Sequence, residues 1–205
     1  MANGNDDDTA PALRIVPATR TSLADLESVF GTRGDAAHCW CQWFKIPARD
    51  WREIGDDEMH DRLADQLASP GPGPGLLAYD GDEPVGWCAI EPRPALTRLR
   101  RSRIVKLGSE RTDLDDEGVW ALSCFVVPPR HRGRGVATEL ARAAVDFAAE
   151  HGARTVEAYA VDVAARARTS AAELYHGTVS MFAAAGFTEV ARPTPGRVVM
   201  QRVLP

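Results

Sequence analysis

The sequence WALSCFVVPPRHRGRGVATEL, residues 120–140, contains three local patterns in a row. Its first part is an apolar run rich in β-branched and aromatic residues, which predicts a buried strand over 120–127. Pro128 and Pro129 end the strand, because proline cannot donate to a sheet ladder. Apolar residues then recur at helical spacing over 136–150. The stretch is therefore predicted to be a strand, a glycine-rich loop and a helix.

The loop over 130–135, Arg-His-Arg-Gly-Arg-Gly, is typical of an anion site. Glycine lets the backbone approach a ligand, and the free N–H groups of a first helical turn point toward it. No Gly-Lys-Ser/Thr follows, as a P-loop requires, and Thr138 stands where a dinucleotide-binding loop has its third glycine. We therefore expect another phosphate ligand, whose charge Arg130, Arg132 and Arg134 would neutralise. A glycine-rich turn without a ligand is the alternative.

Patterns on both sides of this stretch predict one α/β (α+β) domain. The predicted strands are 13–16, 76–79, 85–90, 120–127, 155–160, 187–191 and 198–203. The predicted helices are 22–30, 56–68, 136–150 and 178–185, with a weaker helical pattern over 164–172. The basic stretch 93–111 is predicted to be irregular. This order favours a mixed, mostly antiparallel sheet of about six to seven strands flanked by about four helices, and excludes a helical bundle or a sandwich.

Length and composition limit the class of protein. A chain of 205 residues fits one domain, predicted over 12–205 after a disordered leader over 1–11. The net charge of −5 gives no reason to expect nucleic acid or an anionic membrane as a partner. The acidic N-terminus is unlike a signal peptide and no apolar run could span a membrane, so a cytoplasmic location is expected, with reduced cysteines.

The central stretch resembles the GCN5-related N-acetyltransferases (GNAT superfamily). Their signature, Arg/Gln-x-x-Gly-x-Gly/Ala between the fourth strand and the third helix, is satisfied by Arg130, Gly133 and Gly135. The resemblance in element order covers 13–204, while specific matching is confined to 120–160 and, more weakly, 181–187. It implies a GNAT-like fold, acetyl-CoA as co-substrate with its pyrophosphate on the loop, and a pantetheine arm along the fourth strand.

The residues expected to bind this co-substrate come from the strand end, the loop and the first helical turn. They are Phe125, Val126, Val127, Arg130, Arg132, Gly133, Arg134, Gly135, Val136, Ala137 and Thr138. The resemblance also implies that a backbone amide within 125–127 polarises the acyl carbonyl.

Proton transfer must be assigned to side chains. Many members of the resembled family have a tyrosine four residues before a closing Gly-Phe, as general acid, but this chain has Phe182 there. Tyr175 is the nearest replacement, with His176 as its rival. Glu157 and Tyr159, which share one side of a strand by alternation, are candidate bases. Glu91 is a further candidate for the base and for acceptor contact, and water is the alternative to all of these.

The resemblance also implies that acceptor specificity lies in the front part of the chain, over 34–52. The run His-Cys-Trp-Cys-Gln-Trp-Phe over 38–44 is rich in aromatics and thiols, and Trp40 and Trp43 are the candidate acceptor contacts. A core plug between helices is the alternative. Cys-x-Cys is not the usual zinc spacing, so no metal is expected.

Together these features predict transfer of an acetyl group from acetyl-CoA to a primary amine. The acceptor would be a small molecule, a peptide or a protein, and the enzyme a monomer or homodimer with no nucleic-acid or membrane partner. The alternatives are another acyl-CoA donor and a non-catalytic acyl-CoA sensor.

Overall fold

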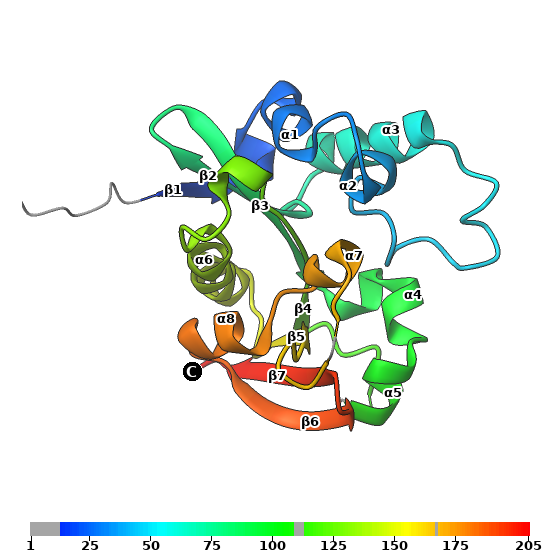
Figure 1. Cartoon of the computed structure of the whole chain (residues 1–205). Helices are drawn as coiled ribbons and strands as arrows, with labels where there is room; N and C mark the ends of the chain where they lie inside the picture. The colour runs from blue at the N-terminus through cyan, green and yellow to red at the C-terminus, as the bar shows by residue number, and fades with distance from the viewer. Residues whose placement is uncertain (1–12, 109–112, 167) are drawn as a thin grey trace, which may run out of the picture.

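Seven strands form one open sheet in the order β1-β2-β3-β4-β5-β7-β6 (Figure 1). The computed structural model describes residues 13–108, 113–166 and 168–205. The strands are β1 (Arg14–Pro17), β2 (Gly75–Asp80), β3 (Glu83–Pro92), β4 (Val119–Val126), β5 (Thr155–Val161), β6 (Thr188–Thr194) and β7 (Arg197–Val203). All neighbouring strands are antiparallel except β4 and β5. The predicted mixed, mostly antiparallel sheet is confirmed.

Helices cover both faces of the sheet (Figure 1). They are α1 (Leu23–Phe30), α2 (Asp35–Cys39), α3 (Asp56–Ala68), α4 (Thr97–Arg100), α5 (Arg103–Gly108), α6 (Val136–Glu150), α7 (Ala171–Leu174) and α8 (Val179–Ala184). The side chains of α6 and α8 pack with one face in the largest core cluster. On the other face, α1 and α3 lie over β2 and β3, while α4 and α5 pack against β5 and β7.

The parallel pair of strands creates the opening on which the site depends. A parallel connection needs a crossover, which α6 supplies between β4 and β5. The two strands pair only from Val119–Thr155 to Leu122–Ala158, while β4 stays paired with β3 as far as Val126. Beyond Leu122, β4 and β5 therefore separate.

A bulge at Ser123 determines which side chains face each side of this opening. In the β3–β4 register, Leu122 pairs with Ile90 and Cys124 with Ala89, so Ser123 is an extra residue in β4. Leu122 and Phe125 consequently both belong to the core cluster beneath α6. Cys124 packs on the opposite face, with the cluster beneath α1 and α3.

The helices predicted over 22–30, 56–68, 136–150 and 178–185 are confirmed as α1, α3, α6 and α8. Ser22 caps α1 with a capping box to Asp25, as Ser-x-x-Asp predicts (Ser22 Oγ accepts from Asp25 N at 3.1 Å). No helix in the three described ranges is long and apolar enough to cross a membrane.

Other helical predictions require correction. The stretch 93–111, predicted to be irregular, contains α4 and α5 in its described part, held by the buried Leu96, Leu99 and Val105. The helix predicted from residue 164 begins only at Ala171. The Asp162 carboxylate accepts from the amides of Ala164 and Ala165, forming a turn that competes with a helix there. The leader predicted over 1–11 lies outside the described residues.

Candidate functional site

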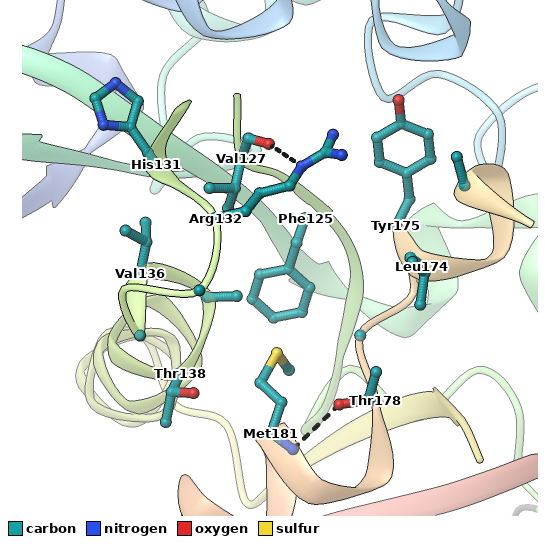
Figure 2. A pocket seen from close by; sticks show the side chains of 15 residues that line it. Phe125, Val127, His131, Arg132, Val136, Thr138, Leu174, Tyr175, Thr178 and Met181 are labelled. Carbon is teal, nitrogen blue, oxygen red and sulfur yellow. Dashed lines mark hydrogen bonds between the residues drawn. The ribbon is translucent and has the colours of Figure 1, made fainter. Parts of the chain in front are cut away.

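A cavity of about 390 Å³ opens on the α6 side of the gap between β4 and β5 (Figure 2). The loop after β4 and the first turn of α6 lie on one side of it, and Leu174 and Tyr175 on the other. We call this cavity 1. Its lining residues are Phe125, Val127, His131, Arg132, Gly133, Gly135, Val136, Ala137, Thr138, Ala171, Leu174, Tyr175, Gly177, Thr178 and Met181.

The loop places backbone donors at the wall of cavity 1. Gly133 and Gly135 adopt left-handed conformations, with φ of 74° and 80°, which side chains rarely allow. A Cβ added at either position would meet no protein atom within 4 Å, so the space above these glycines is free. Gly135 is the N-cap of α6 and no side chain caps this helix end. The first-turn amides and the positive end of the helix dipole therefore suit an anion.

A close contact with β3 positions the start of α6. A Cβ built on Gly86 would lie 2.6 Å from Val136 Cγ1 and 3.2 Å from Leu140 Cδ1. Because β-branched valine is stiff, a side chain at Gly86 would displace the first turn of α6. The position of the loop thus depends on Gly86 in β3. The sequence of the loop alone could not reveal this dependence.

The arginines of the loop differ in their partners. Arg132 lines cavity 1 and its Nε donates to Val127 O at 2.9 Å. Arg130 and Arg134 instead form ion pairs with Glu83 and Asp80, each at 2.8 Å, and do not line the cavity. Of the predicted phosphate-neutralising side chains, the structure brings only Arg132 to the cavity wall.

A short segment after α7 spans the gap between the two strands. Phe125 N donates to Tyr175 O at 2.7 Å on the β4 side, and Val161 N donates to Gly177 O at 2.9 Å on the β5 side. The Phe125 amide, one of the predicted donors to an acyl carbonyl, is therefore occupied by Tyr175. A ligand can use that amide only if this bond is exchanged.

A second cavity, of about 460 Å³, lies on the opposite face of the sheet. We call it cavity 2. Its lining residues are Asp35, Ala36, His38, Cys39, Cys41, Trp43, Phe44, Trp51, Cys124, Val126, Ala172, Glu173, Tyr175 and His176. Val126, predicted to contact the co-substrate, faces this cavity rather than cavity 1. Tyr175 lines both cavities, so they meet at the gap between β4 and β5.

Two residues at this meeting point carry exchangeable protons. Burial raises the pKa of the Tyr175 hydroxyl, and the charge of Asp35 adds to the effect. Burial lowers the pKa of His176 to about 4, and the charge of Arg197 adds to that effect. At neutral pH the phenol is therefore protonated and the imidazole uncharged. His176 Nδ1 lies 3.3 Å from Ser123 O, so it carries the hydrogen and leaves Nε2 with a free lone pair.

Phe182 has no part in proton transfer. It is fully buried, with its ring centroid 5.8 Å from that of Phe125 and 5.2 Å from that of Phe187. Thr178 caps α8 by accepting from Met181 N at 3.3 Å.

The structure places the candidate bases Glu157 and Tyr159 away from both cavities. The two side chains do share one side of β5, and Tyr159 OH donates to Glu157 Oε2 at 2.8 Å. Arg93 Nη1 lies 3.1 Å from the same oxygen, and Gln201 Nε2 donates to Glu157 Oε1 at 2.9 Å. All four residues are buried, and neither Glu157 nor Tyr159 lines a cavity. Glu157 and Tyr159 are therefore members of a buried hydrogen-bond network in the core.

The remaining front-end candidates are divided between core and cavity. Trp43 lines cavity 2, whereas Trp40 is buried and stacks on Phe30 at a centroid distance of 4.9 Å. Glu91 lines neither cavity and forms an ion pair with Lys45 at 2.7 Å. The described residues contain no group of His, Cys, Asp and Glu side chains that could hold a metal ion.

Comparisons with known proteins found one matching family model and several similar folds. A family model described as "Acetyltransferase (GNAT) family" matches residues 40–177. A search of curated proteins found no match. Among solved structures, yncA from Salmonella typhimurium, determined with its cofactor acetyl-CoA, is 16% identical with a TM-score of 0.53 and covers 95% of each chain.

Two further solved structures have comparable similarity. The paia N-acetyltransferase from Thermoplasma acidophilum, in complex with coenzyme A, is 12% identical with a TM-score of 0.53, covering 94% of this chain and 99% of that one. The ribosomal-protein-alanine N-acetyltransferase from Brucella melitensis is 16% identical with a TM-score of 0.52, over 94% and 99%. At these identities the likeness is one of fold.

Proposed function

The chain belongs to the GNAT acetyltransferase family, and from this we propose that it transfers an acetyl group from acetyl-CoA to a primary amine. The observation that carries the proposal is the uncapped start of α6 behind the free space above Gly133 and Gly135, at the wall of cavity 1. Backbone amides at such a helix end bind phosphate, and Arg132 adds a positive charge beside them. Two of the similar structures were determined with acetyl-CoA or coenzyme A.

The residues of the chain fit the parts of this co-substrate. The loop and the first turn of α6, from Arg132 to Thr138, would hold the pyrophosphate, and the wall formed by Phe125 and Val127 would hold the pantetheine arm. Arg130 and Arg134 are already paired with the carboxylates of Glu83 and Asp80, so they would not contact the pyrophosphate directly.

The reaction forms a C–N bond and breaks the C–S bond of the thioester, so one proton leaves the attacking amine and one joins the departing thiolate. We assign the second role to Tyr175, because its hydroxyl stays protonated and its side chain lines both cavities. His176 is placed to accept the proton from the amine, since its Nε2 is unprotonated. A weak base suffices there, because an amine becomes far more acidic once it has added to the carbonyl.

A non-catalytic acyl-CoA sensor is the second candidate. The observation that favours it is Phe182, which is fully buried. Many members of the resembled family have a tyrosine that acts as general acid at this position. Donors with longer acyl groups are compatible with the same loop, because the loop would recognise the pyrophosphate. The domain limits of 12–205, the cytoplasmic location and the monomeric or homodimeric state stay predictions.

Calorimetry combined with a thiol-release assay tests the proposal. Acetyl-CoA should bind and raise the melting temperature more than ATP or NAD, and a panel of primary amines should release coenzyme A thiol. Binding without release for any amine would support the sensor. Absence of coenzyme A binding at millimolar concentration would refute both candidates.

A further inference from the structure

Cavity 2 has the composition of a binding site for a particular class of acceptor. It meets cavity 1 at Tyr175 and lies on the other face of the sheet. If the acyl donor occupies cavity 1, as proposed above, an acceptor nitrogen must reach the gap between the strands from cavity 2. The part of the acceptor that does not react would then lie against the wall of cavity 2.

That wall is rich in aromatic side chains and mostly uncharged. Trp43 and Trp51 make an edge-to-face pair with centroids 4.8 Å apart, and Phe44 lies beside the neutral His176 at 5.4 Å. Burial raises the pKa of the Cys39 thiol to about 12. The Cys124 thiol has a pKa well above its ordinary value because of its hydrogen bond with Cys41 and its burial. The thiols of Cys39 and Cys124 therefore act as small apolar groups, and the wall suits a flat apolar ligand.

Unusual backbone geometry maintains this wall. Trp40 and Cys41 both have left-handed φ angles, 43° and 54°, and are the non-glycine residues with positive φ in the described part of the chain. Such conformations are unfavourable for residues other than glycine and persist only when their surroundings impose them. Cys41 Sγ accepts from Trp87 Nε1 at 3.0 Å, which holds the turn that brings Trp43 to the cavity. The strained turn at Trp40 and Cys41 therefore shapes the wall of cavity 2.

The charges around cavity 2 favour an acceptor that carries a single positive charge. Its lining residues include carboxylates but no lysine or arginine. Glu173 is already paired with Arg166, whereas Asp35 has no ion pair within the described ranges and its charge reaches Tyr175 at the gap. A single ammonium group is therefore attracted to the Asp35 side. At the aromatic end, the Arg98 guanidinium lies 3.9 Å from the Trp43 ring centroid and 5.1 Å from that of Trp51. A second cation on the acceptor would be repelled there.

From these contacts we propose that the acceptor is a primary monoamine carried on a small aromatic body, such as an arylalkylamine. The volume of about 460 Å³ is that of a small-molecule site. The proposal deepens the acetyl-transfer function and commits cavity 2 to the aromatic part of the acceptor.

Direct binding separates this inference from the proposed function. Calorimetry, with and without coenzyme A, should show that tryptamine and 2-phenylethylamine bind at least about ten times more tightly than propylamine, spermidine or a lysine-containing peptide, given the worth of aromatic contacts. Trp43→Ala and Asp35→Asn should each weaken tryptamine binding about tenfold, and Trp43→Phe should restore most of the loss. Asp57→Asn, which changes an exposed carboxylate in the first turn of α3, is the matched control and should change nothing.

Each outcome has a distinct meaning. Tryptamine binding that depends on Trp43 and Asp35, without thiol release, supports the acceptor class and contradicts acetyl transfer. Thiol release with spermidine or the peptide as the better acceptor supports acetyl transfer and overturns the acceptor class. Failure of both aryl amines to bind, or equal binding by Trp43→Ala and wild type, also overturns it.

Discussion

Gly135 and Gly152 provide a matched pair of substitutions at the two ends of α6. Both have left-handed φ angles, 80° and 85°, and a Cβ at either would meet no atom within 4 Å. Alanine in such a conformation costs about 1–2 kcal/mol, partly offset by the lower entropy of the unfolded chain. Gly135→Ala and Gly152→Ala should therefore each lower the free energy of unfolding by about 1 kcal/mol, as measured by urea denaturation.

Binding of acetyl-CoA should separate the two variants. The methyl group of Gly135→Ala enters the space from which phosphate would reach the first-turn amides of Val136 and Ala137. Hydrogen bonds to charged groups contribute about 1.5–3 kcal/mol each, so loss of one should weaken binding by about 10- to 100-fold and loss of two by about 100-fold or more. Gly152→Ala, at the far end of the helix, should bind normally, and Gly135→Asp should bind still less than Gly135→Ala. Equal affinity of Gly135→Ala and Gly152→Ala in calorimetry would mean that the pyrophosphate binds elsewhere.

Three further predictions concern the gap and the core. Tyr175→Phe should lower kcat about 100-fold with unchanged acetyl-CoA affinity; full activity of both Tyr175→Phe and His176→Gln would assign proton transfer to water. Because the pKa of His176 is about 4 in the fold against 6.5 when unfolded, its stabilising effect is complete above pH 6.5 and is lost as the pH falls toward 4. The loss is at most about 3 kcal/mol. The difference in unfolding free energy between wild type and His176→Gln should therefore change by up to that amount between pH 7 and pH 4, and a difference that stays constant would contradict the lowered pKa of His176. Arg93→Met removes the guanidinium that pairs with the buried Glu157 carboxylate and should cost about 3–5 kcal/mol of unfolding free energy, whereas a loss below about 1 kcal/mol would contradict the importance of this buried ion pair.

The sequence predicted those parts of the site that are local. The strand, the loop and α6 follow one another along the chain, so turn chemistry and helical spacing were enough to place Gly133 and Gly135. Features that depend on distant contacts were not accessible. The bond from Phe125 N to Tyr175 O joins residues far apart in the chain, and the role of Gly86 appears only when α6 is packed on β3.

Side-chain alternation succeeded for one strand and was insufficient for another. It correctly placed Glu157 and Tyr159 on one side of β5, as their hydrogen bond shows. It could not show which side of the strand faces a cavity. That side is covered by α4 and α5, which are too short to show helical spacing in the sequence. In β4 the bulge at Ser123 shifts the alternation by one residue, so simple period-two counting fails beyond that point.

The opposite placement of cavities 1 and 2 has a consequence for the time course of turnover. Each cavity opens on its own face of the sheet, so a molecule in one does not obstruct access to the other. Two thiols of cavity 2 are poorly suited to store an acyl group as a covalent intermediate, since burial raises the pKa of Cys39 to about 12 and hydrogen bonding and burial raise that of Cys124 well above its usual value. We therefore expect both reactants to be bound together, and initial-velocity plots to show intersecting rather than parallel lines.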